Sequence, residues 1–104
     1  MKLITKAIQA KLQKNHQTND DEDIVLKLFN PCGAQTWLIT RIEEDNDIMW
    51  GLADLGFGLV EYGTISLNEI KQFKGRFGLG IERDLHFKSG KVKDFIDRTS
   101  LAGC

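Results

Sequence analysis

The sequence predicts one α+β domain in which two helices pack on one face of an antiparallel sheet of about five strands. Three observations lead to this prediction. Residues 79–88 follow a period of two, four apolar or β-branched segments precede them with short connections, and helix-start signals stand at Thr5 and Ser66. A chain of 104 residues, read as one domain over 1–104, can enclose one core and not two.

The first expected element is a helix that begins after Thr5 and runs to about Lys14. Thr5 suits the amino-terminal cap position. Apolar residues recur at every fourth position, at Ile4, Ile8 and Leu12. Residues 15–23 then form a polar loop that ends in four acids. We expect this loop to be solvated, because it lacks the alternating ligands and the glycine of a calcium-binding loop.

Four strands are expected next, over residues 24–29, 36–42, 48–55 and 59–65. A Pro-Cys-Gly turn follows the first strand, an acidic hairpin tip follows the second, and a Gly-Phe-Gly turn follows the third. Connections as short as these predict an antiparallel meander.

A short helix and a last strand complete the expected sheet. Ser66 and Glu69 fit a capping box, which opens a helix of about two turns. Residues 79–88 form the last strand, residues 92–98 a helical turn or two, and residues 99–104 a frayed tail.

One face of the last strand carries an arginine among apolar residues. Arg83 shares this face with Ile81, Leu85 and Phe87. A guanidinium in such a setting is costly to desolvate unless a carboxylate meets it. We therefore predict a structural ion pair between Arg83 and either Asp54 or Glu61, the isolated acids of the preceding apolar segments.

The opposite face of the same strand is polar and carries Glu82, Asp84 and His86, about 7 Å apart in sequence order. Two carboxylates and an imidazole could hold a divalent metal ion or act in general acid-base catalysis. A solvated polar face is the alternative. We favour the solvated face, because a site needs groups that converge from several elements.

Charge is distributed unevenly along a chain whose net charge is −1. Residues 1–65 carry six basic and ten acidic residues, a net charge of −4, and residues 66–104 carry eight and five, a net charge of +3. A nucleic-acid-binding patch in the second part therefore stays open as an alternative. Its basic residues would be Lys71, Lys74, Arg76, Lys88, Lys91 and Lys93, and its stacking residues Trp37, Trp50, Phe57, Tyr62 and Phe77.

Motifs for cofactors, metals and nucleophilic catalysis are absent from the sequence. The glycines form no dinucleotide-binding or phosphate-binding loop, and no serine or cysteine stands in a nucleophile motif. Cys32 and Cys104 belong to no metal-binding pair, which indicates free thiols in a reducing compartment. No apolar run approaches ~20 residues and the amino terminus lacks a secretory signal, so we expect a cytoplasmic protein without cofactor, metal or membrane contact.

Several segments of the sequence resemble one bacterial family. The longest are Trp50–Gly58, Glu61–Ile70 and Gly78–Phe87. The Ile-Glu-Arg-Asp-Leu-x-Phe run that begins at Ile81 is the most specific, and the first five residues and the strand around Trp37 are also similar. The resemblance thus covers most of residues 1–88. The chain departs from the family pattern at Leu59 and Val60, where a proline is expected.

This family is known only as a domain of unknown function, and its members are small proteins carried on plasmids, phages and other mobile elements. The resemblance implies a genomic setting and brings no activity, substrate or catalytic residue. Small proteins in that setting often act on other macromolecules, including host defence nucleases.

From this setting we expect a non-enzymatic accessory protein of a mobile element that binds another protein, with antagonism of host defence as one form of the function. Clustered carboxylates can occupy a basic nucleic-acid groove. The candidate acidic contact surface consists of Asp20, Asp21, Glu22, Asp23, Glu43, Glu44, Asp45 and Asp47. Two alternatives stay open: a small metal-assisted enzyme that uses Glu82, Asp84 and His86, and a nucleic-acid-binding module. The free edges of a meander also allow a homodimer.

Overall fold

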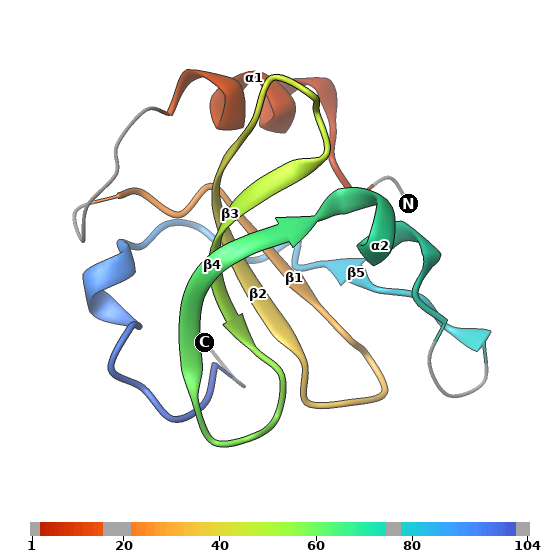
Figure 1. Cartoon of the computed structure of the whole chain (residues 1–104), viewed down its shortest axis with the longest axis vertical. Helices are drawn as coiled ribbons and strands as arrows, with labels where there is room; N and C mark the ends of the chain where they lie inside the picture. The colour runs from red at the N-terminus through yellow and green to blue at the C-terminus, as the bar shows by residue number, and fades with distance from the viewer. Residues whose placement is uncertain (1–2, 16–21, 75–77, 102–104) are drawn as a thin grey trace.

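A five-stranded antiparallel sheet organises the fold, with its strands in the order β4-β3-β2-β1-β5 (Figure 1). The computed structural model describes residues 3–15, 22–74 and 78–101. The elements in chain order are α1 (Lys6–Lys14), β1 (Leu26–Phe29), β2 (Thr36–Ile42), β3 (Ile48–Asp54), β4 (Val60–Ser66), α2 (Leu67–Gln72), β5 (Glu82–Arg83) and the 3-10 helix η2 (Val92–Asp94). The predicted α+β class is confirmed.

Local sequence signals predicted the elements closely as far as α2. The bounds of α1 and β2 are those predicted, and the bounds of β1, β3 and β4 differ from the prediction by one or two residues. Thr5 caps α1 by accepting a hydrogen bond from the Ile8 amide at 3.2 Å. Ser66 caps α2 in the same way, through the Glu69 amide at 3.2 Å.

Both helices cover the same face of the sheet, as predicted, and we call this the helix face. Leu12 of α1 and Leu67 and Ile70 of α2 belong to one buried cluster. The strands contribute Leu26, Leu28, Trp37, Ile39, Ile42 and Met49 to it. Because successive side chains of a strand point to opposite faces, the intervening strand residues face the other way.

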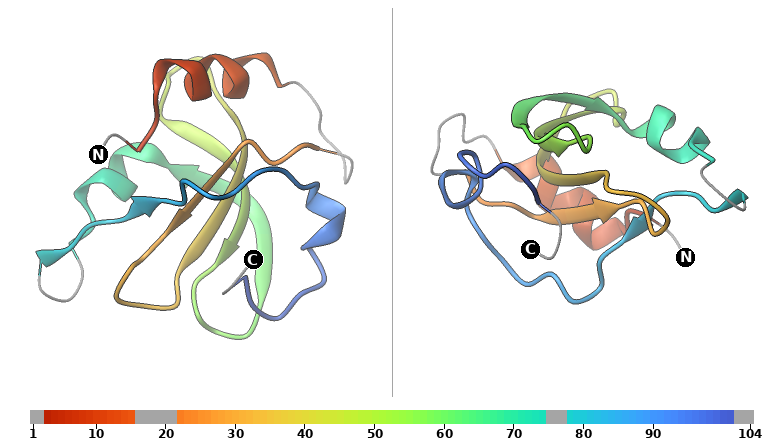
Figure 2. Two further views of the ribbon diagram at one scale, coloured as in Figure 1. Left: turned by 180° about the vertical axis from the view of Figure 1, so that it is seen from behind. Right: turned by 90° about the horizontal axis from the view of Figure 1, so that it is seen from below.

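The segment after β5 covers the opposite face of the sheet, which we call the second face. Figure 2 shows this segment in blue, crossing the sheet from β5 and turning back toward the middle. Val92 and Leu101 pack there against Leu38 and Leu52. Leu101 is fully buried, so the prediction of a frayed tail over 99–104 is wrong at Leu101. Residues 102–104 lie outside the described residues.

The last strand is much shorter than the predicted segment 79–88, because β5 contains only Glu82 and Arg83. Asp84 accepts a hydrogen bond from the His86 amide at 2.8 Å, an arrangement in which an Asp side chain turns the chain. Leu85 consequently lies 63% exposed instead of facing the core.

The position of β5 beside β1 separates Arg83 from both of its predicted partners. Asp54 lies on β3 and Glu61 on β4, and β1 and β2 stand between those strands and β5. The predicted ion pair is therefore wrong. Arg83 lies opposite Leu28, on the helix face, where its Nη1 is buried without a hydrogen-bond partner.

Candidate functional site

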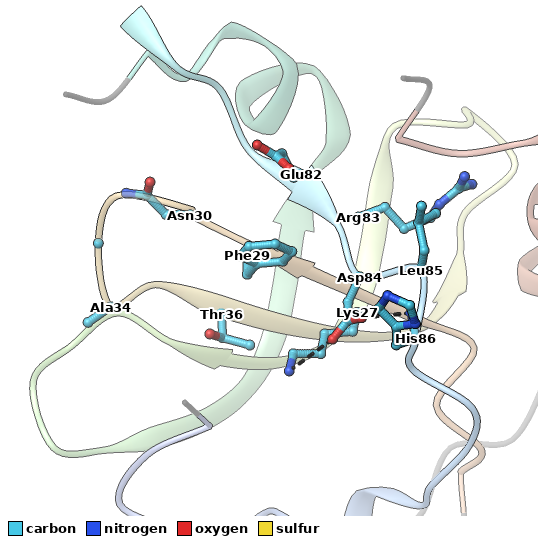
Figure 3. Close-up of a pocket in the computed structure, with 11 residues that line it drawn as sticks. Lys27, Phe29, Asn30, Ala34, Thr36, Glu82, Arg83, Asp84, Leu85 and His86 are labelled. Atoms are coloured by element: carbon cyan, nitrogen blue, oxygen red, sulfur yellow. Dashed lines mark hydrogen bonds and ion pairs between the residues drawn. The ribbon is translucent and has the colours of Figure 1, made fainter. Parts of the chain in front are cut away.

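The predicted polar residues Glu82, Asp84 and His86 all line one pocket of about 420 Å³, between β5 and the hairpin of β1 and β2 (Figure 3). Lys27 and Phe29 of β1 form another part of its wall. Arg83 and Leu85, predicted on the other face of the strand, line the same pocket, so the pocket does not separate the two predicted faces.

Asp84 is the most firmly held group in this pocket. Its carboxylate lies 3.3 Å from Nζ of Lys27, whose side chain is 8% exposed. The hydrogen bond from the His86 amide, and then the bond to Lys27, hold the pKa of Asp84 below its ordinary value. Asp84 is thus ionised near neutral pH and serves as the counter-ion of a buried lysine.

Glu82 lies apart from this ion pair. Its carboxylate points away from Asp84 and His86 in Figure 3. Among residues 3–15, 22–74 and 78–101, no three His, Cys, Asp or Glu side chains lie close enough together to hold a metal ion. Glu82, Asp84 and His86 share a pocket wall and do not converge on one point.

Glu22, one of the predicted contact acids, is fully buried. Its Oε1 lies 3.6 Å from Nε of Arg41, and its Oε2 accepts a hydrogen bond from the Tyr62 hydroxyl at 2.7 Å. The Arg41 guanidinium also lies over the Trp50 ring, 4.6 Å from its centroid. This polar network ties the segment before β1 to β2, β3 and β4, and it removes Glu22 from the predicted acidic surface.

Most other acids of that predicted surface bond within the chain. Asp45 accepts hydrogen bonds from the amides of Asp47 and Ile48 at 2.9 and 3.0 Å and thereby closes the hairpin turn. Asp47 accepts from the Ser66 hydroxyl and the Asn68 amide, which reinforces the start of α2. Glu43 bonds to Trp50 and Arg41, and Asp23 pairs with Lys91. Glu44 is exposed, and Asp20 and Asp21 lie outside the described residues.

We predict that Tyr62 titrates above its ordinary pKa of about 10 in the folded protein. Partial burial raises the pKa of Tyr62, which is 37% exposed, and its hydrogen bond to Glu22 raises the pKa further. Folding thus favours the neutral phenol of Tyr62. The stability that Tyr62 contributes is complete below about pH 10, the pKa in the unfolded chain, and is lost as the pH rises through the raised pKa of the folded protein. Tyr62 is the single tyrosine of the chain, so absorbance at 295 nm reports it alone. An equal or lower pKa in the folded than in the guanidinium-unfolded protein would contradict this prediction.

The hairpin between β3 and β4 carries a cluster of exposed apolar side chains, which we call the apolar loop (residues 55–59; lower end of the hairpin in Figure 1). Leu55 is 46% exposed, Phe57 84% and Leu59 56%. Contiguous exposed apolar groups on a soluble domain mark interaction sites more often than isolated ones do.

Backbone geometry and one buried carboxylate hold the apolar loop in place. Gly56 and Gly58 flank Phe57 with φ values of 90° and 80°, in the left-handed region that glycine occupies without strain. Asp54, 2% exposed, accepts hydrogen bonds from the amides of Gly56 at 2.9 Å and Leu101 at 2.8 Å. The root of the loop is therefore fastened to the core, and Phe57 projects from an ordered backbone.

The sequence prediction placed Leu55 and Leu59 at strand ends and Phe57 in the turn as a stacking candidate, and it did not combine the three into one exposed cluster. A signal was present, because hairpin connections are usually rich in Asn, Asp and Gly. This connection instead places three large apolar residues among its five positions.

The aromatic residues considered for base stacking do not gather on one surface. Trp37 is buried in the core, Trp50 lies under Arg41, and Phe77 is outside the described residues. Of the described aromatic residues in that set, Phe57 is the one that is highly exposed. Among the described residues of that set, the aromatic side chains therefore form no common exposed surface.

The fold and the exposed loop define a small α+β domain with an antiparallel meander, helices on one face and its own C-terminal segment on the other. The chain matches a family model described as "Protein of unknown function (DUF2958)" over residues 3–103, and it belongs to that family. No curated protein and no solved structure matches it. Within the described part of the chain, neither α-helix has the length and apolar character needed to cross a membrane.

Proposed function

We propose that the protein is a non-enzymatic binding module whose apolar loop contacts a partner protein. The observation that supports this is the joint exposure of Leu55, Phe57 and Leu59 on a loop whose backbone is held by Asp54. Transferring a fully exposed Phe side chain into an apolar pocket yields about 1.5–3 kcal/mol. Aromatic anchors of this kind dominate the energetics of protein interfaces.

The apolar loop takes the place of the acidic clusters as the proposed contact surface. The acids mostly close turns, cap α2 or pair with cations of the same chain, so binding a basic partner would require breaking those bonds. The side chain of Phe57 is already largely in solvent among the described residues, so binding through it breaks no ion pair of the kind that holds the acids. The partner's matching feature is an apolar pocket of aromatic size, and Glu61, exposed at the start of β4, would lie at the polar rim.

The mobile-element setting that the family resemblance implies extends this proposal. A small binding protein encoded on a plasmid or phage serves its element by engaging a protein of the host or of the element itself. Antagonism of a host defence protein is one form of that role.

We predict that replacing Phe57 with serine strongly reduces partner capture. Loss of an aromatic anchor costs about 2 kcal/mol or more of binding free energy, which weakens binding roughly 30-fold. Because Phe57 is 84% exposed, the melting temperature should not change. The measurement is affinity capture from a lysate of the encoding bacterium, with quantitative mass spectrometry of the proteins retained by the wild type and the variant.

Leu85→Ser is the matched control, since Leu85 is also exposed, at 63%, and lies just after β5, the strand at the opposite edge of the sheet from β4. This control should retain the same proteins as the wild type. Equal retention by the wild type and Phe57→Ser would refute the apolar loop as the contact surface.

A further inference from the structure

The outer edge of β4 is open. Among residues 3–15, 22–74 and 78–101, β4 ends the sheet, pairs with β3 along all seven of its residues, and has no strand on its other side. Glu61, Tyr62 and Thr64 of β4 are exposed. An edge strand of this length presents unpaired backbone groups to any second strand that can approach it.

The register identifies which backbone groups face outward. The Leu67 amide donates to the Asp47 carbonyl at 2.9 Å, which makes these two residues a hydrogen-bonded pair of the β3 and β4 ladder. Hydrogen-bonded pairs recur at every second residue, and this ladder has no register shift. Residues 61, 63 and 65 therefore bond to β3, and residues 60, 62 and 64 direct their amides and carbonyls outward.

Most of the usual protections of an edge strand are absent from β4, and the exposed charge of Glu61 is the exception. Natural edges are blocked by proline, lysine, a bulge or a short length. β4 contains no proline and no basic residue, its pairing with β3 is regular, and Glu61 is its one charged residue. Gly63 lies at the centre of β4, and a Cβ atom added at this position would have no other atom within 4 Å.

We propose that β4 pairs with β4 of a second copy of this chain, antiparallel, about a two-fold axis through Gly63. In this register Tyr62 of each copy lies opposite Thr64 of the other, and Val60 lies opposite Ser66. Glu61 lies opposite Ile65, so no like charges meet. An axis at Tyr62 or Thr64 would pair only five residues of each strand, whereas the axis at Gly63 pairs all seven.

Gly63 also suits the position on the axis. Because residue 63 bonds to β3, it forms a non-hydrogen-bonded pair across the new ladder, where Cα atoms approach to about 4.5 Å. Glycine leaves this closest approach free of side chains. The outward groups of Tyr62 and Thr64 on either side then form the central hydrogen bonds of the dimer.

Dimerisation of this kind would present two apolar loops from one continuous sheet. Each loop directly precedes β4, so antiparallel strands place the two loops at opposite ends of the paired edge. That these loops bind a partner protein rests on the proposed function, whereas the β4 pairing does not depend on it. A bivalent binder gains avidity for a symmetric or repetitive partner.

Disulfide trapping tests the register directly. In a Cys32→Ser, Cys104→Ser background, Gly63→Cys should form a covalent dimer under mild oxidation, because a Cα separation of about 4.5 Å lies within disulfide range. Glu61→Cys is the control, since four residues of strand, about 13 Å, would separate the two thiols. Crosslinking of both variants to the same extent, or of the Glu61 variant alone, would overturn the proposed axis.

Light scattering at micromolar concentrations tests the assembly without oxidation. The wild type should have the mass of two chains, and Thr64→Pro should have the mass of one, because the proline removes an outward amide that β3 does not use. A monomeric wild type, or a wild type that pairs β4 only with another protein, would overturn the second copy as occupant. Phe57→Ser should remain dimeric while losing partner capture, so a failure of the dimer and a failure of the proposed function are separately visible.

Discussion

Replacing Glu22 with alanine is expected to lower the free energy of unfolding by about 3 kcal/mol, since removing one partner of a buried ion pair leaves the other charge uncompensated. Glu22 is fully buried, lies 3.6 Å from Arg41 and accepts the Tyr62 hydroxyl bond. Arg41 keeps its ion pair with Glu43 and a 20% exposed side chain, which places the cost at the lower end of the range for such pairs.

Urea unfolding followed by circular dichroism measures this change, and Asp23→Ala is the matched control. Asp23 is the next residue, its side chain is 61% exposed, and it pairs with Lys91 at 2.9 Å. An exposed pair of this kind is worth about 0–1 kcal/mol. If the Glu22 and Asp23 variants lose equal stability, the buried network does not hold the segment before β1.

Replacing Leu101 with alanine is expected to cost about 2–5 kcal/mol, the range for truncating a buried leucine. Leu101 is fully buried in the core cluster of the second face. The substitution retains the backbone amide that bonds to Asp54, so it tests side-chain packing separately from the anchoring of the apolar loop.

The measurement is again denaturant unfolding, with Leu85→Ala as a control that should stay within about 0.5 kcal/mol because its side chain is largely exposed. A loss of that same small size at Leu101 would mean that the C-terminal segment is frayed in solution, as the sequence had indicated.

The elements that the sequence predicted well are those decided by short-range chemistry. Thr5 and Ser66 accept hydrogen bonds from amides three residues ahead, and the strand formers of β2 are contiguous in the sequence. Interactions of this range can be recognised from the order of residues alone.

The partners of the buried charges could not be predicted in the same way. Arg83 was assigned to Asp54 or Glu61 because it needed a carboxylate and these acids stood in apolar segments. The choice depended on strand order, and β5 joined β1 instead of β4. Glu22 looked like part of a solvated acidic run, and only the approach of Arg41 and Tyr62 from β2 and β4 placed it in the interior.

The candidate contact surface shows the same division. The sequence shows that three of the five residues of the apolar loop are large and apolar. Whether these side chains are exposed depends on whether another segment covers the loop. The segment after β5 covers Leu52 and Val60 on the second face and leaves Phe57 84% exposed.

The sequence by itself determined where the helices and the first four strands begin, to within two residues, which residues of those four strands share a face, and that the domain is of the α+β class. The tertiary structure alone decided which strands are neighbours, which acids are buried, and which apolar residues stay in water. The physical reason is that capping and alternation act over a few residues, whereas burial and ion pairing depend on segments that only the completed fold brings together.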